Sequence, residues 1–125
     1  MTRSISAGGK AVLAVLFLGL AAAPLPAAAH AILMESVPAV NGTAKGPDLA
    51  LDLRFNSRID KKRSRLTLTA PDQSQTVLPI DLDGPDDRLD TKATLVPGAY
   101  TLRWQVLAID GHITRGDVPF TVEGN

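Results

Sequence analysis

The chain contains two histidines, His30 and His112, and each occupies a position suited to binding a metal ion. His30 follows the run Ala-Ala-Ala at residues 27–29. If the chain is cleaved after Ala29, His30 becomes the first residue. Its α-amino group and imidazole can then close a chelate ring on one metal ion. The alternative is chance, since some residue must follow every cleavage site.

The second histidine lies in AIDGHITRGD, residues 108–117, two positions after Asp110. In an extended segment, residues i and i+2 point to the same side. A carboxylate oxygen and a ring nitrogen could therefore converge on one ion, and Gly111 keeps the space between them open. The alternative is a hairpin turn, because Asp-Gly between apolar-alternating segments is a turn signal. Taken alone, the segment favours the turn, with His112 as an ordinary surface residue.

Taken together, these residues predict a metal site made of His30, Asp110 and His112. With the α-amine, the set has three nitrogen donors and one oxygen donor. Such donors in a tetragonal arrangement suit Cu(II) best among the common ions, and zinc is the main competitor. A closed zinc site would more often use cysteines, and the chain has none. Cu(I) prefers sulfur donors. After residue 29 the only methionine is Met34, which we expect to lie in the core or to fill space as a partly buried side chain.

The first 29 residues have the layout of a secretory signal peptide. Arg3 and Lys10 give a positive start, residues 11–23 are apolar, and residues 27–29 form an A-x-A cleavage site. The apolar run is shorter than the ~20 residues of a membrane-spanning helix. We therefore expect cleavage after Ala29, one domain over residues 30–125, and a periplasmic protein that is not embedded in the membrane.

Composition after residue 29 argues against several other functions. Two of the 13 basic residues fall in the signal, which leaves 11 basic and 13 acidic residues and a net charge of −2. This balance does not suggest binding to nucleic acid or to an anionic membrane surface. Phosphate-loop and Gly-x-Ser-x-Gly patterns are absent. The acidic stretch at residues 81–90 lacks the ligand spacing of a helix–loop–helix calcium site and is interpreted as a solvated turn.

Apolar residues alternate with polar ones along most of this part, which predicts strands with one buried side. The four aromatic residues, Phe55, Tyr100, Trp104 and Phe120, all fall on the inward register. The basic segment 57–64 is expected to be a solvated loop. Turn signals separate about seven short strands, which predicts an all-β, antiparallel Greek-key β-sandwich. The expected strands cover residues 32–36, 48–56, 65–69, 76–81, 88–94, 99–106 and 117–122.

These features together resemble the CopC family of exported copper-resistance proteins. The likeness covers essentially all of residues 30–125. It rests on the order and spacing of several motifs: the HA at the expected new N-terminus, ESVPAVNG, LDLRFN, and LVPGAYTLRWQVLAIDGHITRGDVPFTV.

The resemblance implies a seven-stranded, Ig-like or cupredoxin-like β-sandwich in the periplasm. It also implies a Cu(II) site in which His30 binds through its amine and imidazole, Asp110 through an oxygen and His112 through its imidazole. Some members add a Glu from a Phe-Ser/Asn-Glu motif, but Ser57 stands at that place here. A separate Met- and His-rich Cu(I) site is also lacking. The family analogy suggests a CopD-type inner-membrane copper transporter as a partner on a separate chain.

Three functions remain open on the sequence. The first is a copper carrier or buffer, which is not an enzyme. The second is an enzyme with a histidine brace, like the copper polysaccharide monooxygenases. That reading is weakened by the short chain and by the inward register of all four aromatics, which leaves none for a substrate platform. The third is a metal-free adhesion or structural module, which explains the sandwich but not the placement of both histidines.

Overall fold

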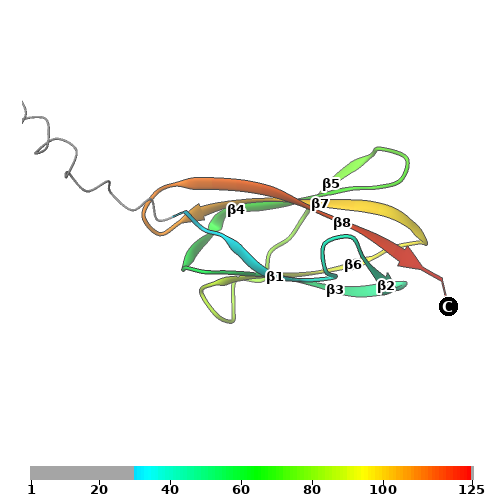
Figure 1. Cartoon of the computed structure of the whole chain (residues 1–125), viewed down its shortest axis with the longest axis horizontal. Coiled ribbons are helices and arrows are strands. Elements are labelled where there is room, and N and C mark those ends of the chain that lie inside the picture. The colour runs from blue at the N-terminus through cyan, green and yellow to red at the C-terminus, as the bar shows by residue number, and fades with distance from the viewer. Residues whose placement is uncertain (1–29, 125) are drawn as a thin grey trace, which may run out of the picture.

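A computed structural model describes residues 30–124 of the chain, which form two β-sheets packed face to face (Figure 1). The predicted signal segment lies outside the described residues. One sheet has the strand order β1-β3-β6 and the other has the order β2-β8-β7-β4-β5. The strands are β1 (Leu33–Val37), β2 (Gly42–Lys45), β3 (Asp48–Phe55), β4 (Ile59–Thr69), β5 (Gln75–Leu78), β6 (Arg88–Thr94), β7 (Gly98–Ala108) and β8 (Ile113–Glu123). The described residues contain no helix that could span a membrane.

The period-two pattern places the core where the sequence predicts it. Along β7, Tyr100, Leu102, Trp104 and Val106 are buried in turn, and the residues between them face outward. Burying a large apolar side chain contributes roughly 1.5–3 kcal/mol relative to leaving it exposed. All four aromatics are buried, as predicted. The largest fully buried side chains are Phe55, Leu51, Leu53, Leu66, Leu89, Leu102, Val106, Val118 and Val122.

Aromatic contacts connect the two sheets and fix the hairpin of β7 and β8. Phe55 of β3 meets Trp104 of β7 edge to face, with ring centroids 5.1 Å apart. Trp104 lies directly over Gly116, its partner on β8, where a Cβ atom would clash with the indole ring. Tyr100 donates a hydrogen bond of 2.8 Å from its hydroxyl to the carbonyl of Val96, four residues earlier. β7 and β8 pair without interruption from Gly98 and Val122 to Leu107 and Ile113, and this pairing positions the turn between them.

The structure has eight strands, one more than the sequence predicts. The additional strand, β2, follows the turn at Asn41 and pairs in parallel with β8, so the sandwich is not wholly antiparallel. Its four residues, Gly-Thr-Ala-Lys, carry little apolar alternation. Such a short edge strand is formed by the neighbour it pairs with, and its own sequence pattern gives no signal for it.

The basic segment at residues 57–64 is not a loop, contrary to the prediction. Most of it belongs to β4, whose pairing with β7 shifts in register between Asp60 and Arg65. Ser64 bridges this irregularity, because its hydroxyl donates to the carbonyl of Asp60 and accepts from the amide of Leu107. A bulge of this kind breaks the alternation that marks a strand in sequence.

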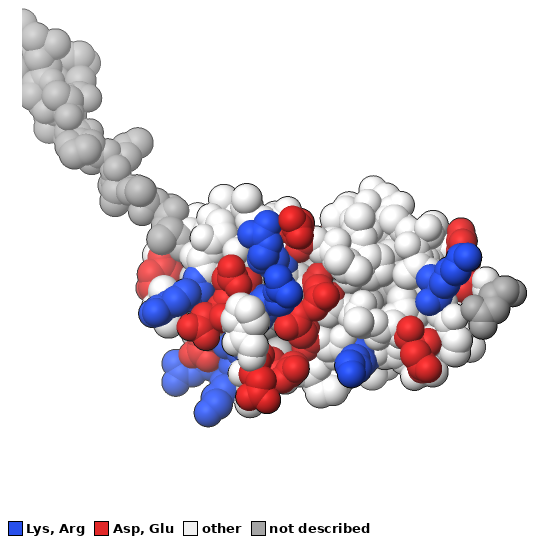
Figure 2. All heavy atoms as spheres, turned by 90° about the horizontal axis from the view of Figure 1, so that it is seen from below, with Lys and Arg blue, Asp and Glu red and all other residues white. Residues whose placement is uncertain are grey.

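Met34 is exposed, so the expectation that it fills the core is wrong. The β1–β3 register shifts between Leu33 and Glu35, and Leu33 is the residue that packs against the core. The acidic stretch that begins at Asp81 is an exposed turn up to Asp86, as predicted, before the chain enters β6. Figure 2 shows acidic and basic side chains interleaved on one face, with no extended area of a single sign there.

Candidate metal centre

The turn between β7 and β8 carries two of the three predicted site residues. The amide of Gly111 donates to the carbonyl of Ala108, and the amide of Ala108 donates to the carbonyl of His112. Gly111 has a φ of 94°, a left-handed conformation that glycine adopts at little cost. The Asp-Gly pair is therefore a hairpin turn. The extended segment that the metal-site interpretation assumed is absent at these positions.

Asp110 and His112 converge through this turn. Oδ1 of Asp110 accepts a hydrogen bond of 3.1 Å from the main-chain amide of His112. Oδ2 of Asp110 lies 3.0 Å from Nδ1 of the same histidine. Side chains of Asp commonly bond the backbone two residues on, and this Asx turn is such a case. Both carboxylate oxygens are thus held by His112, which leaves Nε2 as the ring nitrogen that Asp110 does not engage.

The electrostatics of the turn favour the ionised carboxylate. The hydrogen bond from the main-chain amide of His112 lowers the pKa of Asp110 below its ordinary value, and the contact with the His112 ring acts in the same direction. Partial desolvation opposes both effects. Asp110 is therefore negatively charged at neutral pH and oriented toward the His112 ring. A carboxylate bonded to one ring nitrogen fixes the tautomer that leaves the other free to bind a metal.

The third predicted residue, His30, reaches the turn from the other sheet. Ala31 is buried in the core at 1% exposure. The amide of Ile32 donates to Oδ1 of Asn56 at 2.8 Å, and the amide of Asn56 donates to the carbonyl of Ile32 at 3.0 Å. These contacts bring the start of β1 to the same end of the sandwich as the β7–β8 turn (Figure 1).

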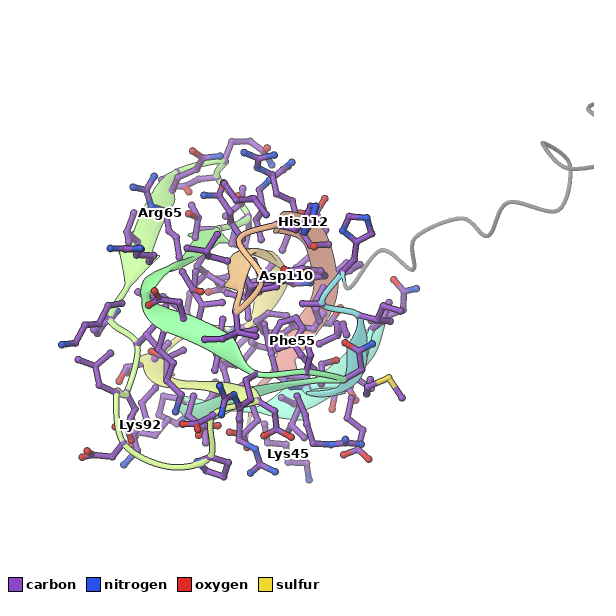
Figure 3. The ribbon with its side chains drawn as sticks, turned by 90° about the vertical axis from the view of Figure 1, so that its left-hand side faces the viewer. Lys45, Phe55, Arg65, Lys92, Asp110 and His112 are labelled. Atoms are coloured by element: carbon purple, nitrogen blue, oxygen red, sulfur yellow. The ribbon has the colours of Figure 1, made fainter. Side chains whose placement is uncertain are left out.

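The imidazoles of His30 and His112 lie side by side at this end. Their ring centroids are 5.2 Å apart and the planes meet edge to face at 81°. In Figure 3, Asp110 and His112 lie on the turn beside the start of the described chain, above Phe55 in the interior. Residues 30 and 112 are far apart in sequence, so the sandwich alone makes them neighbours.

The three predicted side chains are not arranged as a complete metal site in this structure. Over residues 30–124, no group of three or more His, Asp or Glu side chains is arranged to hold a metal ion. In this arrangement Asp110 contacts the main-chain amide and Nδ1 of His112. The predicted fourth donor, the α-amine of His30, is not a side chain and exists only after cleavage.

The structure adds an observation about each of two further residues at this end, Asn56 and Ser57. Asn56 holds Ile32 through both its side chain and its main chain. In the sequence, Asn56 is marked only as the polar end of an alternating strand and as part of the LDLRFN motif, and neither feature indicates this role. Ser57, where some CopC members have Glu, has a buried hydroxyl without a hydrogen-bond partner among the described residues.

The fold and this end of the molecule define an Ig-like β-sandwich with two neighbouring imidazoles and a carboxylate at its surface. The chain belongs to the CopC family, because the sequence model of the CopC domain matches residues 33–123. That range includes Asp110 and His112, and it begins three residues after His30.

Individual relatives agree with this assignment. Protein YobA of Escherichia coli K12 is 30% identical over 99 residues, which cover 76% of this chain and 80% of YobA. The crystal structure of CopC from Methylosinus trichosporium OB3b superposes with a TM-score of 0.71 at 22% identity, covering 77% of this chain and 96% of that one. PcoC, a methionine-rich copper resistance protein from Escherichia coli, gives 0.62 at 24% identity, covering 76% of this chain and 100% of PcoC. The two solved structures confirm the fold.

Proposed function

We propose that this chain is an exported Cu(II)-binding protein that buffers or carries copper in the periplasm. Its site is mononuclear, with His30, His112 and Asp110 as the ligand residues. The observation that carries the proposal is the contact between the two imidazoles, 5.2 Å between centroids, with Asp110 bonded to one of them. The name of the relative PcoC, a copper resistance protein, supports the same role.

The donor atoms favour Cu(II). His30 contributes its amine and imidazole after cleavage, and His112 contributes Nε2, the nitrogen that Asp110 does not engage. Asp110 supplies an oxygen when it gives up one of its two bonds to His112. Three nitrogens and one oxygen suit Cu(II). Met34 is the one methionine after residue 29, so a methionine-rich Cu(I) site is not expected.

The position of the site suits exchange of the metal with another protein. His112 and His30 are exposed at one end of the sandwich, and three isoleucines close to them in sequence, Ile32, Ile109 and Ile113, are also exposed. A receiving protein can therefore approach the donors directly. We propose a CopD-type inner-membrane copper transporter as that partner, on a separate chain.

Carriage of copper is favoured over an enzymatic role as a histidine-brace monooxygenase. An enzyme of that kind needs exposed aromatic side chains to hold a polymeric substrate. Phe55, Tyr100, Trp104 and Phe120 are all buried at 5% exposure or less. In addition, if a carboxylate oxygen of Asp110 were bound to copper, it would occupy a coordination position that a monooxygenase needs for molecular oxygen.

The proposal is tested by titrating Cu(II) into the chain that begins at His30 and recording electron paramagnetic resonance spectra. One equivalent of copper with nitrogen-rich tetragonal parameters is expected. His30→Ala and His112→Ala should each abolish that signal, and Asp117→Asn serves as a control on the same hairpin. Absence of stoichiometric binding by the unmodified chain would contradict the proposal and favour a metal-free module.

A further inference from the structure

Asn56 makes the last contact between β3 and residues 30–32, the segment that carries His30. The β1–β3 pairing ends at Leu33 and Phe55, where regular main-chain bonding stops. One residue further on, the main-chain amide of Asn56 donates to the carbonyl of Ile32 at 3.0 Å. The amide of Ile32 donates to Oδ1 of Asn56 at 2.8 Å. The Asn56 side chain thus supplies the acceptor that a further strand residue would otherwise provide.

This double contact is well placed to act on His30. Ala31 is buried, and Ile32 is held on both its amide and its carbonyl. Only one residue separates Ile32 from His30, so fixing Ile32 restricts the region that the His30 amine and ring can reach. A chain terminus without such contacts is poorly ordered, and ordering it on binding costs affinity.

The contact is also too exposed to be explained by stability alone. The bond between Ile32 and Asn56 lies at the surface, and the Ile32 side chain is 57% exposed. Water can replace an exposed acceptor, so the loss of this bond affects folding little. Its main consequence is local, on the direction in which residues 30 and 31 leave the sheet.

We propose that Asn56 is a positioning residue that holds His30 beside His112 before copper arrives. The preorganised pair then binds the metal without first ordering the terminus. This inference deepens the proposed copper function and rests on it for its biological role. The placement of the two rings, 5.2 Å apart, is a property of the protein without metal and can be tested separately.

The first experiment records nuclear magnetic resonance spectra of the copper-free chain that begins at His30, to measure amide exchange and nuclear Overhauser effects. Asn56→Ala removes the acceptor, and Asn56→Asp keeps an acceptor oxygen in the same place. Thr94→Val is the matched control, because it removes an exposed hydrogen bond to Asp48 at the other end of β3. We expect slow exchange of the Ile32 amide and a nuclear Overhauser effect between the two rings in all but Asn56→Ala, with unchanged thermal melting as the check on folding.

The second experiment measures Cu(II) affinity by competition in the chain that begins at His30. Asn56→Ala should weaken binding about tenfold. Asn56→Asp and Thr94→Val should leave the affinity unchanged, because both keep an acceptor for the Ile32 amide. An equal loss in Thr94→Val, or no loss in Asn56→Ala, would overturn the inference.

The two experiments separate the possible failures. If the Ile32 amide and the ring contact persist in Asn56→Ala, Asn56 does not position His30 and the inference is wrong. If the unmodified chain binds no copper, the proposed function fails. The resonance measurement would still decide whether Asn56 holds the terminus.

Discussion

Both carboxylate oxygens of Asp110 contact a single residue, His112. Oδ1 accepts a hydrogen bond from the main-chain amide at 3.1 Å, and Oδ2 lies 3.0 Å from Nδ1 of the ring. The same pair of residues is both a hairpin turn and half of a candidate copper site. The two interpretations of Asp-Gly-His in the sequence are therefore compatible, because the bonds that shape the turn also orient the imidazole.

Replacing Asp110 with Asn tests this dual role. Asn keeps an oxygen for the His112 amide but removes the charge and the second acceptor. We expect Cu(II) affinity to fall about 10- to 100-fold, the usual cost of losing a ligand or its orienting partner. Competition titration measures the loss, and a change in the copper hyperfine parameters would show that the oxygen itself binds the metal. Unchanged Cu(II) affinity would show that Asp110 neither binds the metal nor orients a ligand.

Copper affinity should depend on pH through the nitrogen donors. In unstructured peptides an α-amine has a pKa of ~8 and an imidazole of ~6.5, and both must lose a proton to bind the metal. The hydrogen bonds from His112 lower the pKa of Asp110, so this carboxylate is already ionised across the neutral range. Affinity should therefore fall steadily as the pH drops from about 8 to about 5. A flat profile in competition titrations over this range would argue against amine and imidazole ligation.

Processing after Ala29 should control the site. In a chain that keeps Ala29 in front of His30, the nitrogen of His30 is an amide and no longer an amine. We expect Cu(II) binding to weaken by about 100-fold, or ~2.7 kcal/mol. Calorimetry on the two chains measures the difference, and Asp117→Asn, which leaves the terminus unchanged, is the control. Equal affinity with and without Ala29 would show that the terminal amine is not a ligand.

A pair of carboxyl groups should make the stability of the sandwich depend on pH. Asp52 and Asp90 face each other across β3 and β6. Burial, followed by the hydrogen bond and the charge of Asp52, raises the pKa of Asp90 to about 6, and Arg88 and Lys61 act in the opposite direction. The folded state therefore holds this proton more tightly than the unfolded chain. The stabilisation is complete below pH ~4 and is lost as the pH rises through about 6.

Asp90→Asn should remove this dependence. The variant should gain about 1 kcal/mol over the unmodified chain at pH 7 and little at pH 4, a value reduced for partial exposure to solvent. Urea unfolding followed by Trp104 fluorescence at several pH values measures the difference. Asp86→Asn, which changes an exposed carboxylate, is the control. If the gain from Asp90→Asn stays constant between pH 4 and 7, Asp90 titrates normally.

Much of the fold follows from local sequence pattern. Alternation along residues 48–56 and 99–106 predicts two strands and the side of each that is buried, because side chains in a strand point alternately to opposite faces. The structure confirms both, as β3 and β7. The CopC resemblance was confirmed by the family match, and the two solved structures confirm the fold. Elements that depend on a neighbour were missed: β2 forms against β8, and the basic start of β4 is a bulged strand against β7.

The sequence by itself determined which residues we propose as ligands: two histidines, an aspartate two residues before one of them, and a predicted cleavage site before the other. Only the tertiary structure decided that they meet. His30 enters from the β1-β3-β6 sheet and His112 from the turn of the opposite sheet, so their contact depends on how the two sheets pack. Asn56 shows the same limit, since its bond to Ile32 spans 24 residues and arises from strand pairing that local pattern does not encode.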